Sequence, residues 1–160
     1  MTNKNTSNEE VLDTKITKKP PILFYGNPKF LYKIYPRVEL EISKEPFFLA
    51  TKYKAIALLN CGNWDDSDFE FGIIDDDDKS NKLFYIKEMY DGALDKVFNN
   101  KKGYLYSFSS KNFFKTKNLV AFEYVSAFQP TILKTKKIEN LLVELKKSRI
   151  FLIKHNDEII

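Results

Sequence analysis

Short runs of hydrophobic residues, separated by turn-forming residues, recur along the chain and predict strands. Gly26-Asn27-Pro28 supplies the turn that ends the first run, and Gln129-Pro130 ends the longest one. The final run lies close to the last residue of the chain. The predicted strands are Ile22–Tyr25, Pro46–Ala50, Tyr104–Phe108, Leu119–Phe128 and Arg149–Lys154.

Helical spacing of apolar residues is less frequent and predicts three short helices. Lys52–Asn60 follows Thr51, a residue type that favours the helix N-cap, and Asp91–Phe98 precedes a pair of asparagines. The stretch 136–147 has apolar residues at i, i+3, i+4 and i+7. These apolar residues are Ile138, Leu141, Leu142 and Leu145. Because strands outnumber helices, the sequence predicts an α+β fold with a mostly antiparallel sheet.

The first residues lack the apolar pattern of the rest. Residues 1–20 are polar and charged, and Pro20-Pro21 separates them from the first predicted strand. We therefore expect a disordered arm over 1–20 and a single α+β domain over 21–160. A chain of 160 residues is of the usual size for one domain.

Charge is spread along the chain. The net charge of +4 comes from 26 basic and 22 acidic residues, and the basic segment 134–148 also contains glutamates. Because a nucleic-acid-binding surface usually concentrates basic residues, this mixing disfavours a nucleic-acid partner. After Asp75 the acidic run 64–78 is followed by neither the central glycine nor the distal glutamate of a calcium loop, so the run is interpreted as a solvated surface loop that binds no metal.

Histidine and cysteine are too few for several common chemistries. The single histidine, His155, lies five residues from the end of the chain, and the single cysteine is Cys61. A Ser-His-Asp or Cys-His mechanism needs a histidine held in a cleft, and a structural zinc site needs about four ligands. Cys61 is interpreted as a small buried hydrophobe. No long apolar run or signal peptide is recognisable, so we expect a cytoplasmic protein that does not enter a membrane.

Three segments, taken in order, resemble the motifs of one enzyme family. Leu23-Phe24-Tyr25-Gly26-Asn27 is similar to a strand that ends in His-Gly-Ser or His-Gly-Thr, and Phe48-Leu49-Ala50-Thr51 to a Tyr-Phe-Ala strand. Phe122-Glu123-Tyr124 is similar to a late strand that bears a glutamate. Together they resemble the histidine/tyrosine/glutamate branch of the ADP-ribosyltransferases. Over about 22–154 the chain is also similar to small proteins of phages and Gram-positive bacteria.

The resemblance implies a split, mostly antiparallel sheet and a site for NAD, used as a substrate without a metal. Cleavage of the nicotinamide–ribose bond passes through an oxocarbenium-like ribose that a carboxylate can stabilise. The resemblance assigns this catalytic role to Glu123 and nicotinamide stacking to Phe48. It therefore requires the two side chains to converge on one cleft. The further ligand contacts that it implies are at Tyr25, Gly26, Asn27, Arg37 and Thr51.

The motif departs from the family pattern, and alternatives stay open. Tyr25 stands where the family has histidine, and Asn27 where it has Ser or Thr. Glu123 could instead face solvent from a half-buried strand, and Phe48 could be ordinary core. The first hypothesis is an NAD- or nucleotide-binding domain that transfers ADP-ribose to a macromolecule. The alternative is a non-catalytic, phage- or plasmid-encoded inhibitor or adaptor whose partner is a protein. A third hypothesis is a nucleic-acid binder that uses the basic 134–148 helix and exposed aromatic residues, and it is disfavoured because the charges in that segment alternate in sign.

Overall fold

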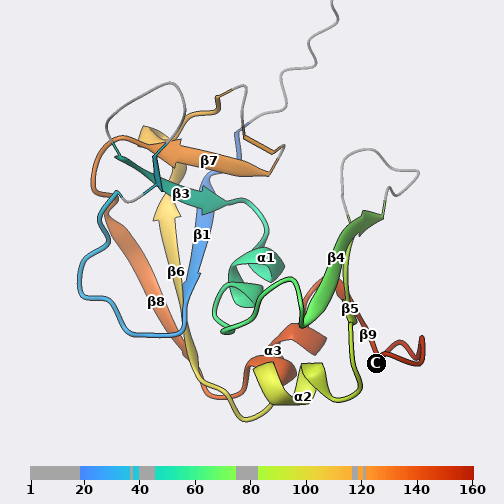
Figure 1. Ribbon diagram of the computed structural model, residues 1–160. Coiled ribbons are helices and arrows are strands. Elements are labelled where there is room, and N and C mark those ends of the chain that lie inside the picture. Colours follow the sequence, from blue (N-terminus) through green and yellow to red (C-terminus); the bar gives the residue numbers. More distant parts are fainter. Residues whose placement is uncertain (1–18, 37, 40–45, 75–82, 117–118, 121) are drawn as a thin grey trace, which may run out of the picture.

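The computed structural model describes residues 19–36, 38–39, 46–74, 83–116, 119–120 and 122–160 (Figure 1). Residues 1–18 of the predicted arm lie outside this part of the chain, as does Arg37. Within it, no helix is long and apolar enough to span a membrane.

The larger of two sheets is antiparallel and carries all three motif segments. Its strands follow the order β2-β3-β1-β6-β8, and β7 also pairs with β3. The three motif-bearing strands β1, β3 and β7 are therefore consecutive neighbours in the sheet. The strands are β1 (Ile22–Asn27), β2 (Val38–Glu39), β3 (Pro46–Thr51), β6 (Gly103–Ser109), β7 (Glu123–Ser126) and β8 (Ile132–Ile138).

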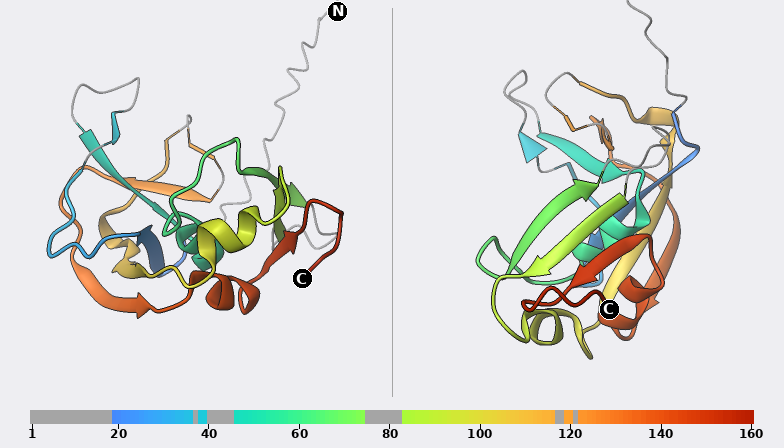
Figure 2. Two further views of the ribbon diagram at one scale, coloured as in Figure 1. Left: turned by 60° about the horizontal axis from the view of Figure 1, so that its bottom comes forward. Right: turned by 90° about the vertical axis from the view of Figure 1, so that its right-hand side faces the viewer.

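The smaller sheet has the order β4-β5-β9. The strands are β4 (Phe69–Ile74), β5 (Leu83–Glu88) and β9 (Ile150–Ile153). β4 and β5 are antiparallel, whereas β9 lies parallel to β5 although it comes much later in the sequence. Figure 1 shows the two sheets on either side of α1, and Figure 2 shows β4, β5 and β9 as a separate layer.

Three short helices, α1 (Lys54–Leu59), α2 (Ala93–Phe98) and α3 (Leu141–Lys146), complete the fold. The side chain of Asn140 caps α3 by accepting a hydrogen bond from the backbone N–H of Val143 at 3.3 Å. At the start of α2 the cap comes from another element. Glu88 of β5 accepts the Leu94 N–H at 2.8 Å and, with its other oxygen, the His155 N–H at 3.1 Å.

Two hydrophobic clusters cover the opposite faces of the large sheet. One lies between the two sheets and contains residues of all three helices, including Leu58, Phe98 and Leu145, with Phe84 of β5. The other contains Leu23, Ile34, Phe48, Ala50, Tyr106, Phe108, Phe113 and Tyr124. Since the face of a strand residue determines which cluster it joins, the side-chain alternation in β1 and β3 decides where each predicted site residue points.

The structure confirms an α+β fold with mostly antiparallel sheets and a few short helices. The first two predicted strands, the strand from Tyr104 and the final strand are all present. The predicted strand Leu119–Phe128 is wrong in length, because among its described residues only Glu123–Ser126 forms a strand. The predicted loop over 64–78 is also wrong in part, because Phe69–Ile74 forms β4 and pairs with β5, a strand that the sequence analysis missed.

The predicted helix over 136–147 is wrong in its first turn. Lys136 and Ile138 belong to β8, and the helix begins only at Leu141. The exposed edge strand β8 carries lysines and a threonine through its middle, so it lacks the apolar alternation that identifies a strand. Thr51 is likewise not the N-cap of α1. It lies earlier in the chain, and its hydroxyl accepts the Tyr53 N–H at 3.2 Å.

Cys61 is buried as predicted, and its environment makes the thiol unreactive. The side chain is 1 % exposed, and Sγ lies 3.4 Å from the carbonyl oxygen of Tyr104. Burial raises the pKa of the thiol to about 11.

We expect native protein at pH 7.5 to react with a thiol-specific disulfide reagent about 100-fold more slowly than protein in urea, because the thiolate is the nucleophile. Absorbance of the released aryl thiolate measures both rates, with glutathione as the exposed reference. Equal rates for native and unfolded protein would show that Cys61 is accessible.

Candidate functional site

The three motif strands are neighbours, but their pairing separates two predicted site residues. Phe48 is opposite Ser126, and Thr51 is opposite Glu123. Directly paired residues project to the same face of a sheet, and successive residues project to opposite faces. Glu123 and Phe48 therefore lie on opposite faces, and the convergence required by the first hypothesis does not occur.

Phe48 belongs to the hydrophobic core. It is 4 % exposed, and its ring centroid lies 5.1 Å from that of Tyr25 and 5.3 Å from that of Phe108, both edge to face. The predicted stacking role of Phe48 is thereby replaced by packing against other rings. Tyr25 is on the same face and shares this cluster.

The Gly26-Asn27 turn is occupied by contacts within the protein. The Asn27 amide donates to the Tyr25 hydroxyl at 3.1 Å, and its side-chain oxygen accepts the Lys29 N–H at 2.9 Å. This second bond is the local pattern of an asparagine turn. A Cβ built on Gly26 would lie 1.6 Å from the carbonyl oxygen of Ala57. Gly26 thus allows α1 to pack closely on β1, and α1 occupies the space beside Gly26 where the resemblance implies a ligand contact.

Glu123 and Thr51 share the other face of the sheet with residues that were not predicted. Phe24 is opposite Thr51 on one side and Ser107 on the other, and Ser107 is opposite Lys134. A row of side chains thus crosses five strands on one face. Two strand spacings, about 10 Å, separate the backbones of Glu123 and Phe24.

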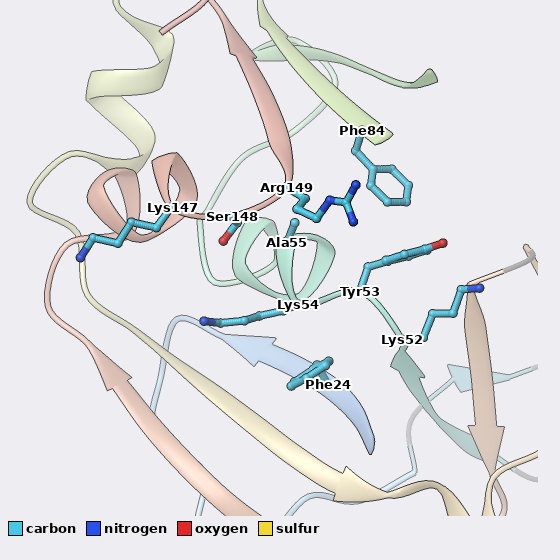
Figure 3. Close-up of a pocket in the computed structure, with 9 residues that line it drawn as sticks. All are labelled: Phe24, Lys52, Tyr53, Lys54, Ala55, Phe84, Lys147, Ser148 and Arg149. Atoms are coloured by element: carbon cyan, nitrogen blue, oxygen red, sulfur yellow. The ribbon is translucent and has the colours of Figure 1, made fainter. Parts of the chain in front are cut away.

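This face borders a pocket of about 320 Å³ between the two sheets (Figure 3). α1 and the residues before it form one wall, β1 contributes Phe24, β5 contributes Phe84, and the segment after α3 contributes Arg149. The complete lining is Phe24, Lys52, Tyr53, Lys54, Ala55, Phe84, Lys147, Ser148 and Arg149.

Aromatic rings and cations meet in this pocket. The rings of Tyr53 and Phe84 are 4.8 Å apart, edge to face, and the Lys52 ammonium lies 5.0 Å from the Tyr53 ring centroid. In Figure 3 the guanidinium of Arg149 lies on the side of α1 where Tyr53 and Phe84 are found, whereas Lys147 extends away. Among the described residues Arg149 forms no ion pair, so its donors are available to a ligand.

Comparison with known proteins does not place the chain in a family: no family model, no curated protein and no solved structure matches it. The assignment of a ligand to the pocket therefore depends on the pocket's own chemistry. No group of three or more residues that could hold a metal ion occurs in the described part of the chain.

Glu123 is half-buried and does not line this pocket. Its partner in β3, Thr51, is followed by Lys52, and the Lys52 N–H donates to the Phe122 carbonyl at 3.0 Å. Burial raises the pKa of the Glu123 carboxyl, while a Val120 backbone hydrogen bond and the charge of Lys115 oppose this rise. A carboxyl group with a raised pKa exchanges protons more readily near neutral pH than a solvated one.

The pocket residues that sequence reasoning missed come from separate parts of the chain. Tyr53 and Lys54 are at the start of a predicted helix, where they read as ordinary surface residues. Arg149 and Phe84 are far from them in sequence, and only the pairing of β5 with β9 brings these two together. One of these residues had a signal in the sequence: the alternation of side chains along β1 places Phe24 on the face opposite Tyr25.

Proposed function

We propose that the protein binds a phosphate-bearing nucleotide, with NAD as the first candidate, in the pocket between its two sheets. The observation that supports this proposal is the joint presence in the pocket lining of two rings, Phe24 and Tyr53, and the guanidinium of Arg149, which forms no ion pair with the described residues. A flat aromatic face suits a nucleotide base, and a guanidinium suits a phosphate. The pocket volume of about 320 Å³ is at the low end of the range for small-molecule sites.

Glu123 is the residue that we assign to the transfer of ADP-ribose. It lies on the same face as Phe24, so a ligand that enters the pocket can extend along the sheet towards it. In the transfer, the bond between nicotinamide and ribose breaks, an acceptor atom bonds to the ribose C1′, and the acceptor loses its proton. A nearby carboxylate stabilises the positive charge on the ribose and accepts that proton.

Calorimetry with NAD tests the binding proposal. We expect wild-type protein to release or absorb heat with one saturable site, and Arg149→Gln to weaken binding about tenfold or more, because a charge-assisted contact to phosphate is lost. Lys146→Gln is the control, since Lys146 is an exposed cation on α3 that lies outside the pocket. We expect its affinity for NAD to stay within about twofold of wild type. Equal weakening by both substitutions, or no heat with wild type, would contradict the proposal.

Glu123→Gln separates binding from turnover. We expect this variant to bind NAD within about twofold of wild type and to release nicotinamide about 100-fold more slowly or not at all, because the general base is lost. Chromatography of the released nicotinamide measures the rate. Release that is unaffected by Glu123→Gln would remove the catalytic assignment and leave the binding proposal in place.

A second pocket supports the alternative function, a non-catalytic interaction module. It has a volume of about 150 Å³ and lies on the opposite face, lined mainly by apolar side chains that include Tyr35 and Phe48. Nearby, Tyr32 is 88 % exposed and contacts the ring of Phe30 at 4.8 Å between centroids. Exposed rings beside an apolar pocket are typical of protein-binding surfaces. If wild-type protein binds no NAD, this surface favours the inhibitor or adaptor function.

A further inference from the structure

A pocket of about 190 Å³ adjoins the pocket of about 320 Å³ between the two sheets, called the cleft pocket from here on, and shares Phe24 and Lys54 with it. Its remaining lining comes from two adjacent strands: Leu105 and Ser107 of β6, and Lys134 and Lys136 of β8. Because two residues line both pockets, the pockets meet over the Phe24 ring. The two pockets together are called the cleft groove below.

Side chains alternate between the two faces of β8, and this determines which of its lysines line the cleft groove. Lys134 is opposite Ser107 and Lys136 is opposite Leu105, whereas Lys137 is opposite Tyr104 and projects to the other face. Residues two apart on a strand lie about 7 Å apart, which is similar to the spacing of consecutive phosphates on an extended nucleic-acid strand. Lys134 and Lys136 are thus on one face of the sheet, although a threonine separates them in the sequence.

The acidic residues of the same segment do not cancel this charge. Glu144 accepts hydrogen bonds from both Lys54 at 3.1 Å and Lys136 at 2.7 Å, so the three groups together retain a net charge of +1. Glu144 is mostly buried, which fixes the two ammonium groups at the place where the pockets meet. Lys134 forms no ion pair among the described residues and adds a further positive charge.

We infer that the cleft groove binds a single strand of nucleic acid, with bases against Phe24 and Tyr53 and backbone phosphates on Lys134 and Lys136. Proteins that bind single strands combine a basic groove with rings on which unpaired bases stack. A duplex is disfavoured because its bases are already stacked inside the helix and cannot reach recessed rings. The inference extends the proposed nucleotide site and shares its Phe24–Tyr53 end. It differs from the sequence-based expectation that nucleic acid is disfavoured.

Fluorescence anisotropy with a labelled oligothymidylate of about 12 nucleotides tests the inference. We expect saturable binding by wild type, with Lys134→Glu weakening it about tenfold or more. The control Lys137→Glu makes the same charge change on the same strand but on the other face, and we expect an effect of less than about twofold. With two phosphate contacts, at Lys134 and Lys136, log affinity against log salt should fall with a slope of about −1.4, and Lys134→Glu should reduce this slope by about 0.7.

Further probes identify what the groove recognises. An oligouridylate of equal length distinguishes RNA from DNA, and either one binding more tightly supports the inference. Equal affinity for the duplex form of the oligonucleotide would overturn it, as would equal weakening by Lys134→Glu and Lys137→Glu. Competition by polyglutamate as strong as that by unlabelled oligothymidylate would also overturn the inference, because the groove would then bind any polyanion and would not recognise bases.

The test separates this inference from the proposed function. Lys134 does not line the cleft pocket, so Lys134→Glu should leave NAD binding unchanged. NAD binding without oligonucleotide binding would overturn only the inference. Oligonucleotide binding that depends on Lys134, without NAD binding, would support the inference and remove NAD as the ligand.

Discussion

Gly26→Ala is expected to destabilise the domain by about 3 kcal/mol, enough to unfold much of the population at 37 °C if stability is at the low end for small domains. The added Cβ would lie 1.6 Å from the Ala57 carbonyl oxygen and 2.8 Å from Cys61 Sγ. The first of these atoms is helix backbone, so relief requires α1 to move away from β1. Urea unfolding followed by Trp64 fluorescence measures the change in free energy.

Gly92→Ala is the matched control. Gly92 has φ +83, and a Cβ built there meets no atom within 4 Å. Gly92→Ala is therefore expected to lower the free energy of unfolding by about 1 kcal/mol, through backbone strain alone. A larger destabilisation by Gly92→Ala than by Gly26→Ala would mean that α1 does not pack on β1 at Gly26.

Leu142→Asp is expected to leave the domain unfolded or nearly so. Leu142 is 6 % exposed and belongs to the cluster between the two sheets. The substitution removes about 2–5 kcal/mol of leucine packing and also places a carboxylate among apolar side chains. Loss of near-ultraviolet circular dichroism and of a cooperative thermal transition would report the result.

The neighbouring residue provides the control for this second variant. Val143 is 47 % exposed on the same helix, within the first turn. Val143→Asp should change the melting temperature by only about 1–3 °C, because an acidic residue near a helix N-terminus is tolerated. If Leu142→Asp melted like Val143→Asp, the buried face of α3 would have been assigned wrongly.

Local patterns predicted most elements whose signals are contained in a few residues. The strand that ends at Gly26-Asn27 and the helix that ends before Asn99 were recognised from their turn residues. The strand β8 was missed because tertiary pairing, and not local alternation, determines it, whereas β5 contains the apolar run Leu83–Ile86, a local signal that was available in the sequence. β8 in particular is mostly exposed lysine and threonine, and its partner β6 holds it extended.

The candidate site shows a different limit of sequence reasoning. The motif resemblance required Phe48 and Glu123 to converge on one cleft, and their strands are paired but project the two side chains to opposite faces. The face on which a side chain projects depends on pairing register, and a difference of one residue reverses it. Phe24, one residue before the predicted contact Tyr25, is the ring that the structure brings to the cleft.

The parallel pairing of β5 with β9 has a consequence for synthesis on the ribosome. The β4–β5 hairpin leaves the exit tunnel well before β9, so one edge of β5 and the apolar side chains of Phe84 and Ile86 are uncovered in the nascent chain. Exposed apolar strand edges of this kind recruit chaperones or neighbouring chains. The time between translation of β5 and of β9 is therefore an interval in which pairing with another chain competes with folding.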